Sequence, residues 1–245
     1  MNCEPFRKYC LINLFKKLVR FFIPPLCPLC SIRKPAKADL ICGVCRKRLP
    51  ELPEAQCTKC GGTNDTILNC CSECLDSKFN WRQGLTLWKY EGIIREALHG
   101  YKYKGDLGVV DFFALEMVAK LQKNKCTEFD CVTWIPLHFT RKFMRGYNQS
   151  ELLAKRICEQ LNLPCKKLID RVKCTRQQAK LKRADRLKNM KNAFRINRKN
   201  CSMIEGQSIL LLDDVFTTGT TLSTVAEILM NCGAESVTVI SIARG

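Results

Sequence analysis

The sequence predicts an α/β protein: a parallel sheet flanked by helices, with a small cysteine-rich module on its amino-terminal side. Two observations support this prediction. Short apolar runs of strand length alternate with segments of helical pattern along residues 80–245, which is typical of parallel sheets. Four CxxC pairs lie together between residues 27 and 74, in a stretch with few large apolar side chains. We therefore expect three parts: an amino-terminal helix (residues 1–25), a cysteine module (26–75) and a main domain (80–245).

Composition limits the classes of protein to which this chain can belong. Its 245 residues include 46% hydrophobic and 26% charged residues, which is typical of a globular protein and excludes wholesale disorder or a fibrous repeat. Lysine and arginine number 41 against 23 acidic residues, so the formal net charge is +18. Such an excess favours polyanionic partners, namely nucleic acid, phosphates or an anionic membrane surface.

Residues 1–25 have the pattern of an amphipathic helix that ends at Pro24 and Pro25. One interpretation is a helix for a membrane surface or a partner, and the other is a helix packed on the rest of the protein. Lys16, Lys17 and Arg20 interrupt its apolar residues, so it does not read as a secretory signal. No apolar run approaches the roughly 20 residues of a membrane span. We expect a cytoplasmic protein, in which thiols stay reduced.

The cysteine module has the ligand spacing of structural zinc sites. A CxxC turn presents two thiolates, and two turns complete a tetrahedral site that leaves no position open for chemistry. Thioredoxin-like redox chemistry is disfavoured, because no βαβ pattern surrounds these pairs. Sequential pairing predicts two zinc ribbons, and a cross-braced pairing is the alternative. The spacings are Cys27-x2-Cys30-x11-Cys42-x2-Cys45 and Cys57-x2-Cys60-x10-Cys71-x2-Cys74.

The first half of the main domain contains three predicted strands and three predicted helices. Apolar patterning indicates strands at residues 85–90, 130–135 and 164–168, and helices at 93–100 and 107–123. Asn148 and Glu151 have the spacing of a capping box, so a further helix should begin there. Residues 166–199 then carry 14 basic residues and two aspartates, a net charge of +12 with little apolar periodicity.

The second half of the main domain contains the most specific motif of the chain, ILLLDDVFTTGTT at residues 209–221. Four apolar residues predict a strand buried on both faces, and a helix at 221–232 and a strand at 236–242 follow. Carboxylates accept hydrogen bonds from vicinal hydroxyls, and a threonine–glycine turn that opens a helix suits a phosphate. Diol and phosphate together describe a ribose 5-phosphate. An acidic turn that caps a helix is the alternative, and it explains Asp213 alone.

This motif closely resembles the phosphoribosyl-pyrophosphate (PRPP) signature of type I phosphoribosyltransferases, except that Phe216 stands where the family usually has an aliphatic residue. Further motifs occur in the same order as in the ComF family of competence-associated proteins, which the chain resembles from about residue 20 onward. These motifs are the tandem CxxC pairs, Tyr90-Glu91-Gly92 with Arg95, Lys102-Tyr103-Lys104-Gly105-Asp106, Ile135-Pro136-Leu137-His138 with Arg141, and Arg145-Gly146-Tyr147-Asn148-Gln149.

The resemblance implies a type I phosphoribosyltransferase-like fold and a set of site residues. PRPP would be bound by Asp213, Asp214, Val215, Thr217, Thr218, Gly219, Thr220 and Thr221. Its pyrophosphate would lie against Leu137, His138, Arg141 and Arg145, with Mg²⁺ as cofactor beside the two zinc ions. A flexible loop with Gln178, Arg183 and Arg186 would close over the ligand, although Arg176, Lys180 and Lys182 depart from the family pattern. Arg95, Lys102 and Lys104 would lie in the hood over the acceptor, as anion contacts at most.

Two functions from different classes follow from the resemblance. The first is a phosphoribosyltransferase that displaces Mg-pyrophosphate from C1 of PRPP with a nitrogen nucleophile. The second is a competence factor of natural transformation that binds incoming single-stranded DNA and uses PRPP only as ligand or regulator. ComF relatives are linked to DNA uptake beside a helicase-like partner, which favours involvement in DNA uptake and leaves turnover open. A peripheral location at the inner membrane is compatible with this role.

Overall fold

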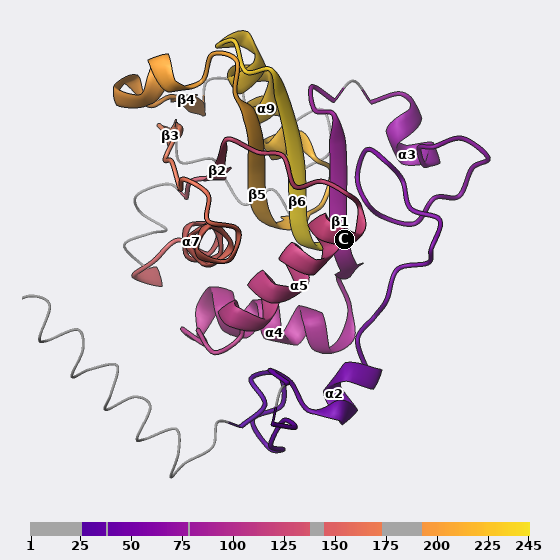
Figure 1. The fold of residues 1–245 in the computed structure, drawn as a ribbon. Helices are drawn as coiled ribbons and strands as arrows, with labels where there is room; N and C mark the ends of the chain where they lie inside the picture. Colours follow the sequence, from indigo (N-terminus) through magenta and orange to yellow (C-terminus); the bar gives the residue numbers. More distant parts are fainter. Residues whose placement is uncertain (1–25, 38, 78, 138–144, 173–192) are drawn as a thin grey trace, which may run out of the picture. The chain divides into compact units, whose positions relative to one another are not determined.

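The computed structural model describes residues 26–37, 39–77, 79–137, 145–172 and 193–245 (Figure 1). The chain forms two compact units, Met1–Arg48 and Leu49–Gly245, which we call the small and the large unit. The predicted module boundary near residues 75–80 differs from this division and stays a prediction. The predicted helix at residues 1–25 lies outside the described residues.

The small unit is built around its cysteines. Its described helix, α2 (Gly43–Lys47), begins directly after Cys42 and buries Cys45. The amide of Ser31 donates to the carbonyl of Cys27 at 2.7 Å, which closes the turn between the first two cysteines. Among the described residues of this unit, the buried side chains are three of its cysteines and Ile41.

The large unit contains the predicted parallel sheet. Its strand order is β1-β6-β5-β2, and every neighbouring pair is parallel, as the alternation of strands and helices predicts. Ile209–Leu212 are fully buried at the centre of β5, which confirms the prediction of a strand covered on both faces. The four strands are β1 (Gln83–Lys89), β2 (Cys131–Trp134), β5 (Ser208–Phe216) and β6 (Ser236–Arg244).

Helices cover both faces of this sheet (Figure 1). Helix α9 (Thr220–Asn231) shares a buried cluster with Ile209 and Leu211 of β5. Because side chains alternate along a strand, Leu210 and Leu212 face the other way, where α5 (Val110–Lys123) and α7 (Gln149–Leu161) pack on each other and on the sheet. Helix α4 (Gly92–Tyr103) follows β1 directly.

The described helices begin close to the predicted residues. The capping prediction is confirmed for α7, because the Asn148 side chain accepts a hydrogen bond from the amide of Ser150 at 3.1 Å. Helix α9 begins at Thr220, one residue earlier than predicted, and its N-cap is Gly219 with φ of +72°. A side chain there would be strained, and its Cβ would also lie 2.6 Å from Cζ of Phe216.

The predicted strand at residues 164–168 is wrong in its extent. Cys165 makes a single parallel bridge to Val132, flanked by hydrogen bonds at 2.9 Å from Val132 to Pro164 and from Lys166 to Val132. The chain then leaves β2 and pairs elsewhere, in an antiparallel ladder of β3 (Ile169–Arg171) and β4 (Phe194–Ile196). Sequence periodicity cannot reveal strands of only three residues. A short 3-10 helix, Arg198–Met203, leads from β4 toward β5.

The second cysteine segment packs directly on β1. The amide of Gly84 donates to the carbonyl of Thr58, and Thr86 Oγ1 donates to the carbonyl of Cys60, both at 2.8 Å. The backbone approach is so close that a Cβ at Gly84 would lie 1.9 Å from the carbonyl oxygen of Lys59. A one-turn helix, α3 (Ser72–Leu75), presents Cys74 to the same interior. This segment therefore belongs to the large unit.

Candidate functional site

The acidic pair, Asp213 and Asp214, lies at the carboxyl end of the central strand. The prediction ended this strand at Leu212, whereas β5 continues to Phe216, so both carboxylates project from regular strand backbone beside β6. Ligands of open parallel sheets bind at this edge, where strands lead into loops and helix amino termini. The pair therefore lies at the edge of the sheet where such ligands bind.

The Asp213 carboxyl group accepts two hydrogen bonds and has a raised pKa. Its Oδ1 accepts a hydrogen bond from the amide of Asp214 at 2.9 Å and a longer one from Ser150 Oγ at 3.4 Å. Burial raises the pKa of Asp213 to about 7, and the charge of Asp214 adds to this, while the two donors and Lys102 act in the opposite direction. A carboxyl group that titrates near neutral pH is characteristic of functional sites.

Asp214 forms an ion pair that the sequence analysis did not anticipate. Lys102 Nζ, from the last turn of α4, lies 2.8 Å from Asp214 Oδ1, and both side chains are 17% exposed. Burial acts to lower the pKa of Lys102, but the attraction of Asp214 outweighs it and the pKa lies above its usual value. The sequence placed Lys102 in a hood as an anion contact. In this structure its anion is the protein's own carboxylate.

A threonine loop, residues 217–220, joins β5 to α9. Thr218 Oγ1 and Thr220 Oγ1 share a hydrogen bond at 2.8 Å, and the carbonyl of Gly219 accepts from the amide of Ser223 at 2.7 Å. Gly219 caps the helix without a side chain, so the first amides of α9 have no side-chain cap acceptor. Hydroxyls and amides at a helix amino terminus suit a phosphate group.

A second group of residues approaches the acidic pair from α4 and α7. Tyr101 OH donates to the carbonyl of Gln149 at 2.7 Å, and Gln149 Nε2 donates to the carbonyl of Lys102 at 3.4 Å. Arg145 Nη1 donates to Gln149 Oε1 at 3.1 Å, and its guanidinium lies 4.8 Å from the ring centre of Tyr103. These bonds fix the end of α4, and with it Lys102, beside the amino terminus of α7.

Some predicted site residues can be placed and others cannot. Leu137 follows β2. Ile135, the residue directly after that strand, donates its amide to the carbonyl of Leu212 at 2.9 Å, so Leu137 lies at the same sheet edge as the acidic pair. His138 and Arg141 lie outside the described residues, as do Gln178, Arg183 and Arg186. The structure therefore brings together the acidic pair, the threonine loop and the start of the predicted pyrophosphate loop.

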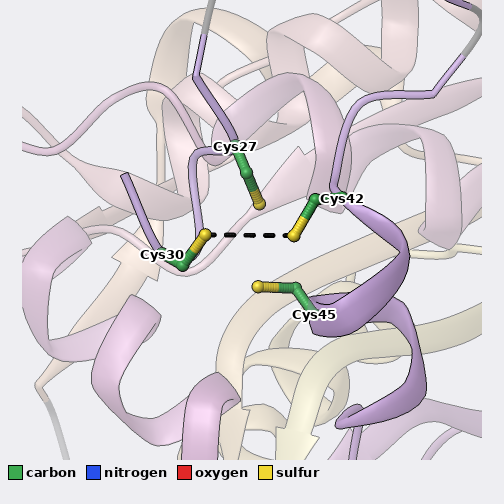
Figure 2. A group of neighbouring side chains, drawn as sticks. All are labelled: Cys27, Cys30, Cys42 and Cys45. Atoms are coloured by element: carbon green, nitrogen blue, oxygen red, sulfur yellow. Dashed lines mark hydrogen bonds between the residues drawn. The ribbon is translucent and has the colours of Figure 1, made fainter. Parts of the chain in front are cut away.

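The eight CxxC cysteines form two four-thiol clusters, grouped as sequential pairing predicts. The four sulfurs of each cluster lie within 4.8 Å of one another. Figure 2 shows the first cluster, with Cys30 Sγ 3.9 Å from Cys42 Sγ. In the second, Cys60 Sγ lies 3.8 Å from Cys71 Sγ. Tetrahedral zinc with Zn–S bonds of about 2.3 Å places sulfurs about 3.8 Å apart, so both clusters fit this metal.

The environment of the thiols also suits a metal. Gly62 and Lys59 each donate a backbone amide to a sulfur of the second cluster at 3.4 Å, as expected for thiolate ligands. Amides of residues 33 and 32 lower the pKa of Cys30 to about 6. The Cys74 thiol, with help from the Gly62 amide and Arg244, lowers the pKa of Cys60 to about 5 against the effect of burial.

No helix among the described residues is both long and apolar enough to cross a membrane.

Known proteins resemble this chain at two levels, in one domain and over most of its length. Residues 147–245 match the family model described as phosphoribosyl transferase domain. Competence protein F of Haemophilus influenzae is 27% identical over 209 residues, which cover 83% of this chain and 90% of that protein. The DNA utilization protein YhgH of Escherichia coli K12 is 27% identical over 227 residues, 91% of this chain and 98% of YhgH. Competence protein ComFC of Bacillus subtilis is 28% identical over 84% of this chain and 85% of its own length.

The similarity to YhgH covers 91% of the chain and so includes cysteine clusters as well as the sheet, and the family model covers β5, α9 and β6. The chain is therefore similar over most of its length to competence protein F, ComFC and YhgH, and it joins a phosphoribosyl transferase domain to amino-terminal cysteine clusters.

Proposed function

We propose that the carboxyl end of β5 binds PRPP with Mg²⁺, and that the protein acts in DNA uptake. The single observation that supports the site best is the acidic pair on β5, directly followed by a threonine loop that opens α9. Competence and DNA utilization are the functions named for the relatives, and we extend them to this chain as part of the proposal.

Each part of PRPP has a matching group in this arrangement. The carboxylates of the acidic pair accept hydrogen bonds from the ribose hydroxyls, and the threonine loop receives the 5-phosphate. Arg145 supplies a positive donor for the pyrophosphate, and His138 and Arg141, which lie outside the described residues, are the further donors that the sequence suggests. Mg²⁺ prefers hard oxygen ligands, which the pyrophosphate and the ribose hydroxyls provide. Because Lys102 pairs with Asp214, ribose binding requires that the carboxylate contact both groups or that this ion pair break.

In the transferase hypothesis these groups position the reactants and stabilise the charge that develops during the reaction. The bond between C1 and pyrophosphate breaks as a nitrogen nucleophile of the acceptor forms a new bond to C1, and the pyrophosphate leaves with the bonding electron pair. Positive charge that develops on the ribose ring is stabilised by nearby carboxylates. The acceptor is unidentified, so we assign no base.

Calorimetry with PRPP tests the site. We expect saturable, Mg²⁺-dependent binding to the unchanged protein and weakening of about 100-fold in the variant Asp213→Asn/Asp214→Asn, since hydrogen bonds to charged groups are worth about 1.5–3 kcal/mol each. Asp170→Asn is the matched control, because Asp170 pairs with Lys167 at the surface of β3. Equal affinity in the double variant and the unchanged protein would contradict the proposal.

Binding of single-stranded DNA is the second candidate, and a specific observation favours it: the net charge of +18, with +12 of it in residues 166–199. We expect the association constant for an unstructured oligonucleotide to fall steeply as salt rises, because neutralised phosphates release counterions. A salt-independent constant would remove this candidate. Release of pyrophosphate on addition of candidate acceptors distinguishes an enzyme from a binding protein.

A further inference from the structure

Arg244, near the end of β6, occupies the space between the second cysteine cluster and the threonine loop. Its backbone pairs with Lys89 of β1 and Phe216 of β5, so the residue lies at the centre of the sheet edge. The side chain is only 15% exposed. A buried guanidinium needs several partners, because five N–H donors lose their water when it is covered.

The partners of this guanidinium belong to two different functional parts. Nη1 donates to the backbone carbonyl of Thr217, the first residue of the threonine loop. Nη2 forms an ion pair with Glu73, which stands between the predicted zinc ligands Cys71 and Cys74. The guanidinium carbon also lies 5.1 Å from the ring centre of Phe216, a distance at which cation–π attraction applies.

The hydrocarbon part of the side chain contacts the same cluster. A Cβ at Gly62, two residues after Cys60, would lie 3.1 Å from Cγ of Arg244, so the stem packs against this turn. The ring of Phe216 in turn lies under Gly219, and it meets Phe79 and Trp81 edge-on at 6.3 Å and 6.1 Å between ring centres. Arg244 thus contacts both halves of the cluster and the first residue of the loop, and its neighbour Phe216 contacts Gly219.

We propose that Arg244 is a positioning residue that couples the second cysteine cluster to the threonine loop, so that an intact, metal-loaded cluster holds the loop in its ligand-binding shape. The metal fixes the turn that carries Glu73, Glu73 fixes one side of the guanidinium, and the guanidinium fixes the Thr217 carbonyl. The consequence for PRPP rests on the proposed function, whereas the coupling itself concerns only the conformation of the loop.

The contributions of the two contacts should differ. Glu73 is 72% exposed, and exposed ion pairs contribute little because water screens them. The bond to the Thr217 carbonyl acts directly on the threonine loop, and the loss of a hydrogen bond from a charged group is worth about tenfold or more in affinity. We therefore expect Arg244→Gln to weaken PRPP binding about tenfold and Glu73→Gln about twofold. Arg244→Lys keeps the positive charge but lacks a guanidinium that can donate to Thr217 and Glu73 at once. Its affinity for PRPP should therefore be closer to that of Arg244→Gln than to that of the unchanged protein.

Amide hydrogen exchange without ligand tests the coupling independently of PRPP. In Arg244→Gln, amides of residues 217–221 should exchange at least about fivefold faster than in the unchanged protein. The zinc content should stay at two ions per chain, one for each cluster. Arg156→Gln is the control: Arg156 of α7 also pairs with two acids, Asp111 of α5 at 3.0 Å and Glu159 of α7 at 2.8 Å, but it contacts neither the cluster nor the loop in these pairs.

The outcomes separate the two proposals. Unchanged exchange at residues 217–221 in both Arg244→Gln and Arg244→Lys, with both zinc ions retained, would overturn the coupling even if PRPP binds. Faster exchange in these variants, together with no PRPP binding by the unchanged protein, would support the coupling and overturn the proposed function. If Arg244→Gln does not fold, the exchange rates at residues 217–221 are measured in Arg244→Lys and Glu73→Gln instead, and unchanged rates in both variants overturn the coupling.

Discussion

Asp213 should make the protein less stable at alkaline pH than a neutral side chain would. Its carboxyl group has a pKa of about 7 in the folded protein against a reference value of 3.8, chiefly because it is buried. A raised pKa means that the folded state binds the proton more tightly than the unfolded state does. The stability that this proton provides is complete below about pH 4 and is lost as the pH rises through about 7.

The variant Asp213→Asn removes this titration and keeps the oxygen that accepts from the Asp214 amide at 2.9 Å. Each pKa unit corresponds to about 1.4 kcal/mol, so the stability of the variant relative to the unchanged protein should increase by about 2 kcal/mol between about pH 5.5 and about pH 8. Above about pH 8 the difference should stay constant. The variant should at the same time bind PRPP poorly, because the amide replaces an acceptor oxygen with a donor.

Equilibrium unfolding in urea at the two pH values, with zinc present, measures this difference. Thiols and other groups titrate in both proteins, so their contributions cancel when the variant is compared with the unchanged protein. Asp170→Asn, which also replaces a carboxylate with an amide but at the ion pair with Lys167, is the matched control variant. If the stability difference between Asp213→Asn and the unchanged protein is the same at both pH values, the burial argument for Asp213 is wrong.

Two further predictions concern the supports of the site. Asn148→Ala removes the cap of α7 and should lower the free energy of unfolding by about 1 kcal/mol, measurable in urea, whereas Glu159→Ala at the other end of α7 should change it by less than about 0.5 kcal/mol. No change for Asn148→Ala would contradict the capping role. Gly84→Ala places a Cβ 1.9 Å from the Lys59 carbonyl oxygen and should lower the free energy of unfolding by about 2 kcal/mol. The variant should also lose zinc to a chelator more readily than the unchanged protein. If it keeps all of its zinc, the second cluster does not depend on its contact with β1.

Much of this fold follows from local patterns in the sequence. The apolar run at residues 209–212 predicts a strand covered on both faces, because four consecutive apolar residues cannot alternate between core and water. The CxxC spacing predicts four-thiol clusters, because ligands of one knuckle are necessarily close in space. The helix cap at Asn148 is also local, because its side chain bonds to an amide only two residues along the chain. In each case the residues that determine the structure are neighbours in the chain.

The parts that the sequence analysis missed depend on contacts between distant residues. Lys102 reaches Asp214 because β1 and α4 place it there, and no spacing in the sequence encodes a pair separated by 112 positions. Arg244 meets Glu73 across 171 positions. The ladder of β3 and β4 joins strands too short to show a period. An excess of basic residues suggests anion binding in general, and only the fold shows which acids those basic residues contact.

The most direct test of the account is to locate bound PRPP by amide hydrogen exchange in the presence of Mg²⁺. The account predicts strong protection of the peptide that spans residues 213–222 and weaker protection at the start of α7, near Arg145. Saturating PRPP that leaves residues 213–222 unprotected, or that protects only peptides of the cysteine clusters, would contradict the assignment of the sugar–phosphate site to the end of β5.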